Sequence, residues 1–160
     1  MKILIAIMMA LTLVFSGCSK SKDADPVIQV KADDKAMNDA IAKAKASSKD
    51  FVAAFHAKKS GTNAFSVKKP YPTPDGGHEH MWIDVTDESN GIIQGIVAND
   101  ADATLEVKLG QKVSLKLEEI SDWKYQDGKK MIGGYTVRYF IDRMSPKERE
   151  EFLKEAGFEL

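Results

Sequence analysis

The chain has 160 residues, of which 43% are apolar and 29% charged, and this length suffices for one hydrophobic core in one domain. Its 23 basic and 24 acidic side chains are interspersed. No region therefore carries the strong positive field of a nucleic-acid-binding protein, so nucleic acid is not an expected partner. The single cysteine, Cys18, excludes an internal disulfide and a metal site built from cysteines.

The first 17 residues have the pattern of an export signal. Lys2 gives a short positive start, and residues 3–15 form an apolar run that only Thr12 interrupts. This run is shorter than the roughly 20 apolar residues that a helix needs to cross a membrane, but it has the length of the apolar part of a signal peptide. We therefore expect residues 1–17 to direct export and to be removed.

The residues around Cys18 resemble the lipobox of bacterial lipoproteins, in which small residues precede an acylated cysteine. Ser16 and Gly17 fit this pattern, whereas Phe15 stands where leucine is usual. The alternative is a secretory signal followed by a free thiol, which is a liability in an oxidising compartment. We expect the Cys18 sulfur to carry a diacylglycerol and the freed amine to carry a further chain such as palmitate. Ser19 resembles the sorting pattern for the outer membrane of a Gram-negative host, which would place the chain in the cell envelope facing the periplasm.

Residues 18–32 are expected to form a tether. They are rich in serine, lysine and aspartate and contain Pro26, a composition typical of a solvated linker. Residues 33–160 are expected to form a single globular domain, because regular apolar periodicity begins there.

A helix is predicted at the start of this domain. Side chains at spacings of three and four form one stripe, made of Met37, Ile41, Ala44, Ser48, Phe51, Val52 and Phe55. Asp33 or Asp34 would cap the helix, which would stop near Lys59.

Between residues 63 and 131 the apolar period is mostly two, which predicts antiparallel strands with one buried and one wet face. A strand at 65–67 is expected to lead into a loop that contains Pro70, Pro72 and Pro74. Further strands are expected at 81–85, 92–98, 105–109 and 113–117. The Asn90-Gly91 turn would begin one hairpin, and the Asp127-Gly128 turn would join 123–126 with 129–132.

The C-terminal part favours helices. Residues 135–144 fit a helical face, although their composition also suits a strand. Ser145, Pro146 and Glu148 form a capping box for a last helix that Gly157 ends. The predicted class is α+β, with an N-terminal helix, a small twisted antiparallel sheet of about five or six strands, and C-terminal helices.

Five segments in this order resemble a known family. They are Glu79-His80-Met81-Trp82, Gly95-Ile96-Val97-Ala98-Asn99-Asp100, Ile120-Ser121-Asp122-Trp123, Gly133-Gly134-Tyr135-Thr136 and Arg143-Met144-Ser145-Pro146 with Glu148. Over about residues 37–152 the chain resembles the YegJ-like bacterial lipoproteins, whose globular part is called domain of unknown function 2314. The resemblance agrees with the lipidation pattern and implies no particular activity.

The predicted strand at 81–85 places His78, His80, Trp82 and Asp84 on the face opposite the core. His78 and His80 could bind one divalent metal, with Asp84 or His56 as a third ligand. The structural alternative has the His80 imidazole hydrogen-bonded to a loop and the Trp82 indole covering the sheet.

A second candidate site is an aromatic binding surface for a peptide or glycan, made of His80, Trp82, Trp123, Tyr125 and Tyr135. The pairs Asn99-Asp100 and Ser121-Asp122 are expected to make turn and cap hydrogen bonds. Nucleophilic catalysis is not supported, because no Gly-x-Ser-x-Gly elbow or phosphate-binding glycine loop occurs and Cys18 is used for the lipid.

Three functional hypotheses follow. The first is a non-enzymatic, membrane-anchored interaction module of the envelope, with no cofactor, that binds a protein or polymer through the aromatic surface. The second is a metal-binding protein or metal-dependent hydrolase that uses His78, His80 and Asp84. The third is an inhibitor or immunity-type protein that neutralises a toxin or a lytic enzyme.

Overall fold

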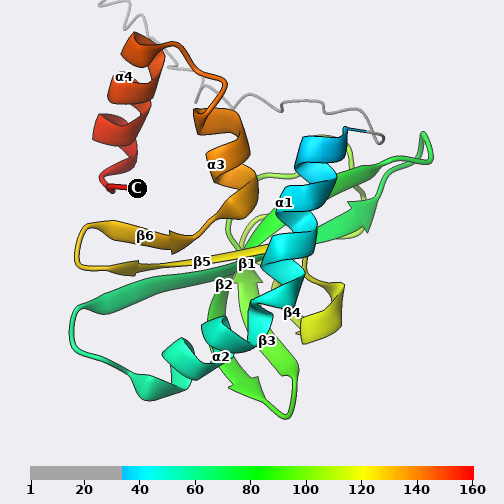
Figure 1. The fold of residues 1–160 in the computed structure, drawn as a ribbon. Coiled ribbons are helices and arrows are strands. Elements are labelled where there is room, and N and C mark those ends of the chain that lie inside the picture. Colours follow the sequence, from blue (N-terminus) through cyan, green and yellow to red (C-terminus); the bar gives the residue numbers. More distant parts are fainter. Residues whose placement is uncertain (1–33) are drawn as a thin grey trace, which may run out of the picture.

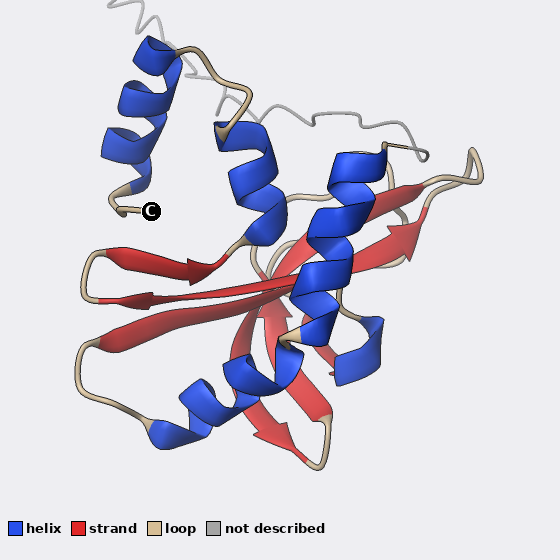
Figure 2. Ribbon diagram, viewed as in Figure 1, coloured by secondary structure: helices blue, strands red, loops and turns tan. Residues whose placement is uncertain are grey.

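A computed structural model describes residues 34–160. In this range the chain forms four α-helices and a six-stranded antiparallel sheet, which confirms the α+β class (Figure 1, Figure 2). The signal segment 1–17, the lipidation residue Cys18, the tether 18–32 and Asp33 lie outside the described residues.

The elements follow the chain in the order helices, strands, helices. The helices are α1 (Lys35–Ala46), α2 (Ser48–Ala57), α3 (Tyr135–Ile141) and α4 (Pro146–Ala156), with a short 3-10 helix η1 (Leu117–Glu119). The strands are β1 (Thr62–Pro72), β2 (His78–Ser89), β3 (Ile92–Val97), β4 (Lys112–Lys116), β5 (Asp122–Asp127) and β6 (Lys130–Gly133).

The strands lie side by side in the order β4-β3-β2-β1-β5-β6. Strands β1 to β4 run as a meander, and β5 returns to the other side of β1. The C-terminal segment adds to the β6 edge, where Lys130 and Glu159 form a short parallel bridge. This order makes β1 the neighbour of both β2 and β5, and the candidate site lies on these three strands.

The core lies between one face of the sheet and helices α1 and α2 (Figure 1). Phe51 of α2 packs against Phe65 of β1 and Trp123 of β5, with both pairs of ring centroids 5.7 Å apart. The Trp123 indole N–H donates to the Ala44 carbonyl of α1 over 2.9 Å. The indole thus joins α1 to the sheet through both apolar contact and a satisfied buried donor.

The prediction of one long N-terminal helix is wrong, because α1 and α2 are separate helices divided at Ser47. The Ser47 hydroxyl lies 2.8 Å from the Lys43 carbonyl oxygen and 3.0 Å from the Tyr135 hydroxyl. A serine side chain in this position competes for helical backbone groups and bends the chain. The predicted Asp34 cap is confirmed, since its carboxylate accepts from the Met37 amide over 2.8 Å.

The predicted proline loop is also wrong in its extent. Pro70 and Pro72 belong to β1, and only Pro74 lies in the turn that follows. Strand β5 pairs with β1 only as far as Lys68, so beyond that residue β1 is an edge strand on this side. An edge strand tolerates prolines, because a missing N–H costs nothing where no neighbouring strand accepts it.

The predicted strand at 105–109 is absent, and these residues belong to the connection between β3 and β4. The Glu79 carboxylate accepts the backbone N–H groups of residues 102–104 over 2.8–2.9 Å. Those donors are thereby satisfied by a side chain instead of a strand neighbour. Leu105 and Leu109 are 85% and 50% exposed.

The remaining elements are confirmed. Both predicted hairpin turns connect paired strands, and residues 135–141 are helical. Ser145 and Glu148 form the reciprocal capping box of α4, which ends at Gly157. The strand predicted at 113–117 is confirmed as β4 with bounds shifted by one residue, because Leu117 already starts η1.

Gly133 lets β6 end directly against Trp123. A Cβ atom there would lie 2.3 Å from the Trp123 carbonyl oxygen, and φ is +75°. At Gly128 φ is +63°, but no atom lies within 4 Å of the corresponding position.

We expect Gly133→Ala to lower the free energy of unfolding by more than ~3 kcal/mol and Gly128→Ala by ~1 kcal/mol in urea titrations. Equal losses would show that the contact with Trp123 is not what requires glycine.

Candidate functional site

The candidate site lies on the face of the sheet opposite α1 and α2. Strand alternation and register place five side chains on this face: Lys68 of β1, His80, Trp82 and Asp84 of β2, and Lys124 of β5. We call this set the polar face. The predicted grouping of the β2 side chains on one face is confirmed by their register, because Met81 and Ile83 between them are fully buried in the core.

The half-buried Trp82 indole has two lysine ammonium groups over its ring. Lys68 Nζ lies 4.5 Å and Lys124 Nζ 4.6 Å from the ring centroid, which is within the range of cation–π attraction. Lys68 Nζ also donates to the Thr136 hydroxyl over 2.9 Å. Neither lysine forms an ion pair with any residue of the range 34–160.

The Asp122 carboxylate, which is fully buried, lies at the start of β5 beside these lysines. One oxygen accepts the amides of Trp123 and Tyr135 over 2.8 and 3.1 Å. The other accepts the amide and hydroxyl of Thr136 over 2.8 and 2.6 Å. Asp122 therefore joins β5 to the first turn of α3 and holds the Thr136 hydroxyl that Lys68 contacts.

Lys68 and Lys124 are partly buried, whereas His80 is exposed at the surface, and the pKa values of all three groups are lowered. Desolvation lowers the pKa of Lys68 to about 8, an effect that Lys124 increases and Asp122 opposes. Desolvation also lowers the pKa of Lys124, against the attraction of Asp84 and Asp122. Desolvation of the imidazole, together with Lys68 and His78, lowers the pKa of His80 to about 4. At neutral pH His80 is thus neutral, while Lys68 still carries most of its charge.

His80 bonds to a loop, as its structural alternative predicted. Its Nδ1 lies 2.8 Å from the hydroxyl of Ser121, which precedes β5. A serine beside a histidine is the geometry of a nucleophile and its base. However, Ser121 is only 2% exposed, and among the described residues no carboxylate bonds to the other His80 nitrogen. The pair therefore lacks the access and the third member of a hydrolase triad.

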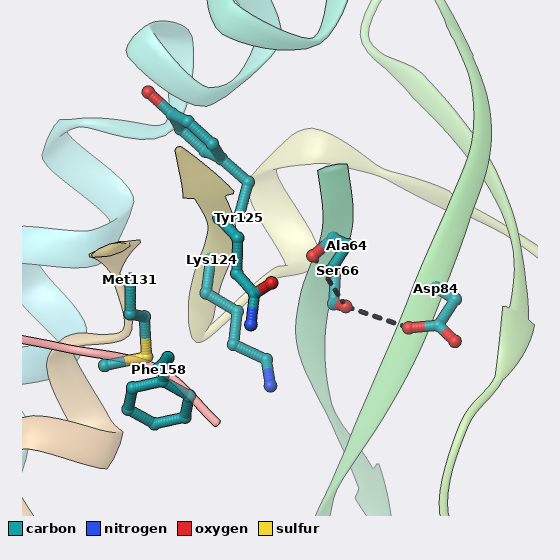
Figure 3. Close-up of a pocket in the computed structure, with 8 residues that line it drawn as sticks. Ala64, Ser66, Asp84, Lys124, Tyr125, Met131 and Phe158 are labelled. Carbon is teal, nitrogen blue, oxygen red and sulfur yellow. Dashed lines mark hydrogen bonds between the residues drawn. The ribbon is translucent and has the colours of Figure 1, made fainter. Parts of the chain in front are cut away.

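A small hollow of about 170 Å³ lies beside Lys124. Its lining residues are Ala64, Ser66, Asp84, Lys124, Tyr125, Gln126, Met131 and Phe158. Figure 3 shows the Lys124 ammonium extending between Met131 and Phe158 on one side and Ser66 and Asp84 on the other. The Ser66 hydroxyl donates to the Asp84 carboxylate over 2.8 Å. The Tyr125 ring points away from this space (Figure 3). The hollow has the volume of about five water molecules, which suits a small polar group.

The structure does not bring the predicted aromatic surface together. Trp123, Tyr125 and Tyr135 lie on the helix-covered side, where Trp123 is 3% exposed and packs 6.2 Å from Tyr125 and 5.8 Å from Tyr135, between ring centroids. His80 and Trp82 lie on the polar face. Trp123 pairs with the buried Val67 of β1, so it faces inward, and an indole that contacts the core cannot also line a surface groove.

The predicted metal ligands are also only partly grouped. His78, His80 and Asp84 lie at alternate positions of β2 and so on the same side of the sheet. His56 lies on α2, with its Nε2 2.5 Å from a Glu88 oxygen. Within residues 34–160 no group of three or more histidine, cysteine, aspartate or glutamate side chains is placed to hold a metal. The Lys68 charge near His80 would repel a divalent cation. Metal binding stays a prediction.

Sequence reasoning missed Lys68, Lys124 and Thr136, because lysines in amphipathic strands ordinarily face water. Asp122 was expected to make cap hydrogen bonds, and it does. Asn99 has a similar role, since its side-chain oxygen accepts the Trp82 amide over 2.8 Å. The period-two pattern alone could have placed Lys68 on the outer face, but not beside Trp82.

The model of the bacterial family described as "Uncharacterized protein conserved in bacteria (DUF2314)" matches residues 34–160. The chain belongs to this family. The chain is 34% identical over 145 residues to "Uncharacterized protein YegJ" of Escherichia coli, across 91% of this chain and 93% of that protein. It is 32% identical over 73 residues to "Putative ankyrin repeat protein" of Neisseria meningitidis serogroup B, across 46% of this chain and 29% of that protein. No solved structure matches the chain.

Family membership confirms the resemblance predicted from the five sequence segments. The structure gives several of these segments a role in the fold, as the contacts of Glu79, Asn99, Asp122 and Gly133 show. Between residues 34 and 160 no helix is both long and apolar enough to cross a membrane.

Proposed function

We propose that this member of the family is a lipid-anchored protein of the bacterial cell envelope. Residues 1–17 direct export, Cys18 carries the lipid, and residues 18–32 form the tether. In a Gram-negative host the domain faces the periplasm from the outer membrane. The support is the charged start, the short apolar run and the small residues before Cys18.

We further propose that the domain is a non-enzymatic interaction module that binds a protein or polymer of the envelope through the polar face. The observation that carries this proposal is the half-buried Trp82 indole with two ammonium groups over its ring. Holding two like charges on one ring costs folding free energy, because the lysines repel each other and lose hydration. A binding role accounts for that cost, since tryptophan and basic side chains are typical anchors of recognition surfaces.

The polar face supports binding better than catalysis. Its histidine bonds to the buried Ser121 hydroxyl, which a substrate cannot reach. General acid–base work at neutral pH is most efficient with a group whose pKa lies near the ambient pH, whereas that of His80 is about 4.

Lipid attachment is tested by growing bacteria that express the full chain with labelled palmitate. We expect the wild-type chain and a Ser21→Ala control to be labelled and membrane-bound. Cys18→Ser should lose the label and leave the membrane fraction, because only the Cys18 thiolate can form the thioether. Mass spectrometry of the mature N-terminus checks the result. A wild-type mature chain without acyl mass would contradict the anchor.

Binding through the polar face is tested by sedimenting the full chain, in non-ionic detergent, with isolated cell walls that retain their bound proteins. We expect Trp82→Ala to lower the bound fraction by about fivefold or more, because truncating a central aromatic anchor typically costs over 1 kcal/mol. Leu105→Ala removes an apolar side chain that is 85% exposed and lies outside the polar face, so it should bind as the wild type does. Circular dichroism verifies that both variants are folded. Equal binding of wild type and a folded Trp82→Ala variant would contradict the proposal.

A further inference from the structure

The geometry points to an oxyanion-binding site on the polar face, where a carboxylate or phosphate group of the ligand would bind between Lys68 and Lys124 beside Trp82. This inference rests on the proposed function and deepens it, because it names the chemical group that the same face recognises.

Most N–H donors of the Lys68 and Lys124 ammonium groups have no acceptor within residues 34–160. A lysine ammonium has three N–H donors. Lys68 uses one on the Thr136 hydroxyl, while the Lys124 ammonium lies over the indole ring and forms no hydrogen bond or ion pair with a described residue. Two donors of Lys68 and three of Lys124 thus have no acceptor within residues 34–160. Both ammonium groups lie about 4.5 Å from the centroid of the same ring, and the charge of Lys124 contributes to lowering the pKa of Lys68, so the two groups are near enough to interact. One small anionic group bound between them could accept from both.

The neighbouring carboxylates of Asp84 and Asp122 form no ion pair with the two lysines. Each oxygen of Asp122 accepts two hydrogen bonds, and the four donors belong to β5 and α3. Asp84 accepts from Ser66 and forms no ion pair with Lys124. These carboxylates reduce the positive field, but they do not occupy the ammonium donors.

Lys68 and Lys124 are both partly buried. Burial strengthens the attraction between a charged pair, because the effective dielectric constant falls below that of water. Desolvation and mutual repulsion both lower the pKa of Lys68, and a bound anion would relieve the repulsion. The groups that face Lys68 are Lys124 and Asp122 of β5, Trp82 and His80 of β2, and Thr136 of α3. His80 is neutral at neutral pH and adds no opposing charge.

A hollow lies beside Lys124, and neither Lys68 nor Trp82 is among its lining residues. Its volume of about 170 Å³ can hold a few non-hydrogen atoms. Met131 and Phe158 give it an apolar side next to the ammonium (Figure 3). The anionic group itself would bind between the two lysines, and a carbon chain attached to it could extend past Lys124 into this hollow.

The test is a titration of the full chain in non-ionic detergent with inorganic phosphate and, separately, with acetate. Sodium chloride at equal ionic strength is the reference. The readout is the indole N–H resonance of Trp82, which the spectrum of Trp82→Phe distinguishes from that of Trp123. We expect a saturable shift with at least one anion, and the tighter binder identifies the phosphate or carboxylate class.

The variants locate the site. Lys124→Gln and Lys68→Met should each weaken binding by about tenfold or more, since each removes a charge-assisted hydrogen bond. Lys49→Gln, an equal charge change on the exposed surface of α2, should bind as the wild type does. If Lys68→Met does not fold, Lys124→Gln alone decides the question. The absence of a saturable shift, or an equal loss with Lys49→Gln, would overturn the inference.

A pH series adds an independent check. Acetate keeps its charge between pH 7 and pH 9, whereas Lys68, with a pKa of about 8, loses its proton over this range. Acetate binding should therefore weaken at pH 9. Cell-wall binding that depends on Trp82 without any anion binding would overturn the oxyanion site alone. Anion binding without cell-wall binding would instead contradict the proposed function alone.

Discussion

The buried Asp122 carboxylate is the interaction on which the polar face depends. A buried charge is costly unless hydrogen bonds replace its lost hydration, and Asp122 accepts four of them. These bonds join β5 to α3 and hold the Thr136 hydroxyl where Lys68 donates to it. The charge of Asp122 also opposes the loss of the Lys68 proton. Without it, Lys68 would keep only the repulsion of Lys124 and the weak attraction of the indole.

Side-chain acceptors also fix the loop beside Trp82. Glu79 accepts three successive amides of residues 102–104, and Asn99 accepts the Trp82 amide. Desolvation would raise the pKa of Glu79, but its three N–H donors outweigh that effect and lower it. The carboxylate therefore stays ionised at neutral pH, and the connection between β3 and β4 stays bound to β2. Several family segments thus have a structural role that supports the strand carrying Trp82.

Local patterns predicted much of the fold. The alternation along β2 fixed which of its side chains leave the core, because a strand has only two faces. Asn90-Gly91 and the Ser145–Glu148 capping box are equally local signals, and both are confirmed. Ser47 broke the predicted helix because its hydroxyl bonds partly to the distant Tyr135, a contact that helical spacing cannot reveal.

The rest of the site depends on contacts between distant segments. Pro70 and Pro72 fit a strand only because β5 ends its pairing at Lys68. Trp82 meets both lysines only because β1 lies between β2 and β5, an order that the sequence pattern leaves open. Trp123 was assigned to a surface because its strand register, and hence its face, was unknown. Periodicity therefore predicted which β2 side chains belong to the site, whereas tertiary structure placed Lys68 and Lys124 beside them.

The most direct test of a desolvated lysine without an ion pair on the polar face is the pKa of Lys68 itself. It can be measured by following the Nζ resonance of the ¹⁵N-labelled full chain with pH, with Lys68→Met used to assign the signal. We expect a titration midpoint of about 8. A midpoint at the ordinary lysine value of 10.5 would show that the ammonium is solvated or already paired, and would contradict this description of the site.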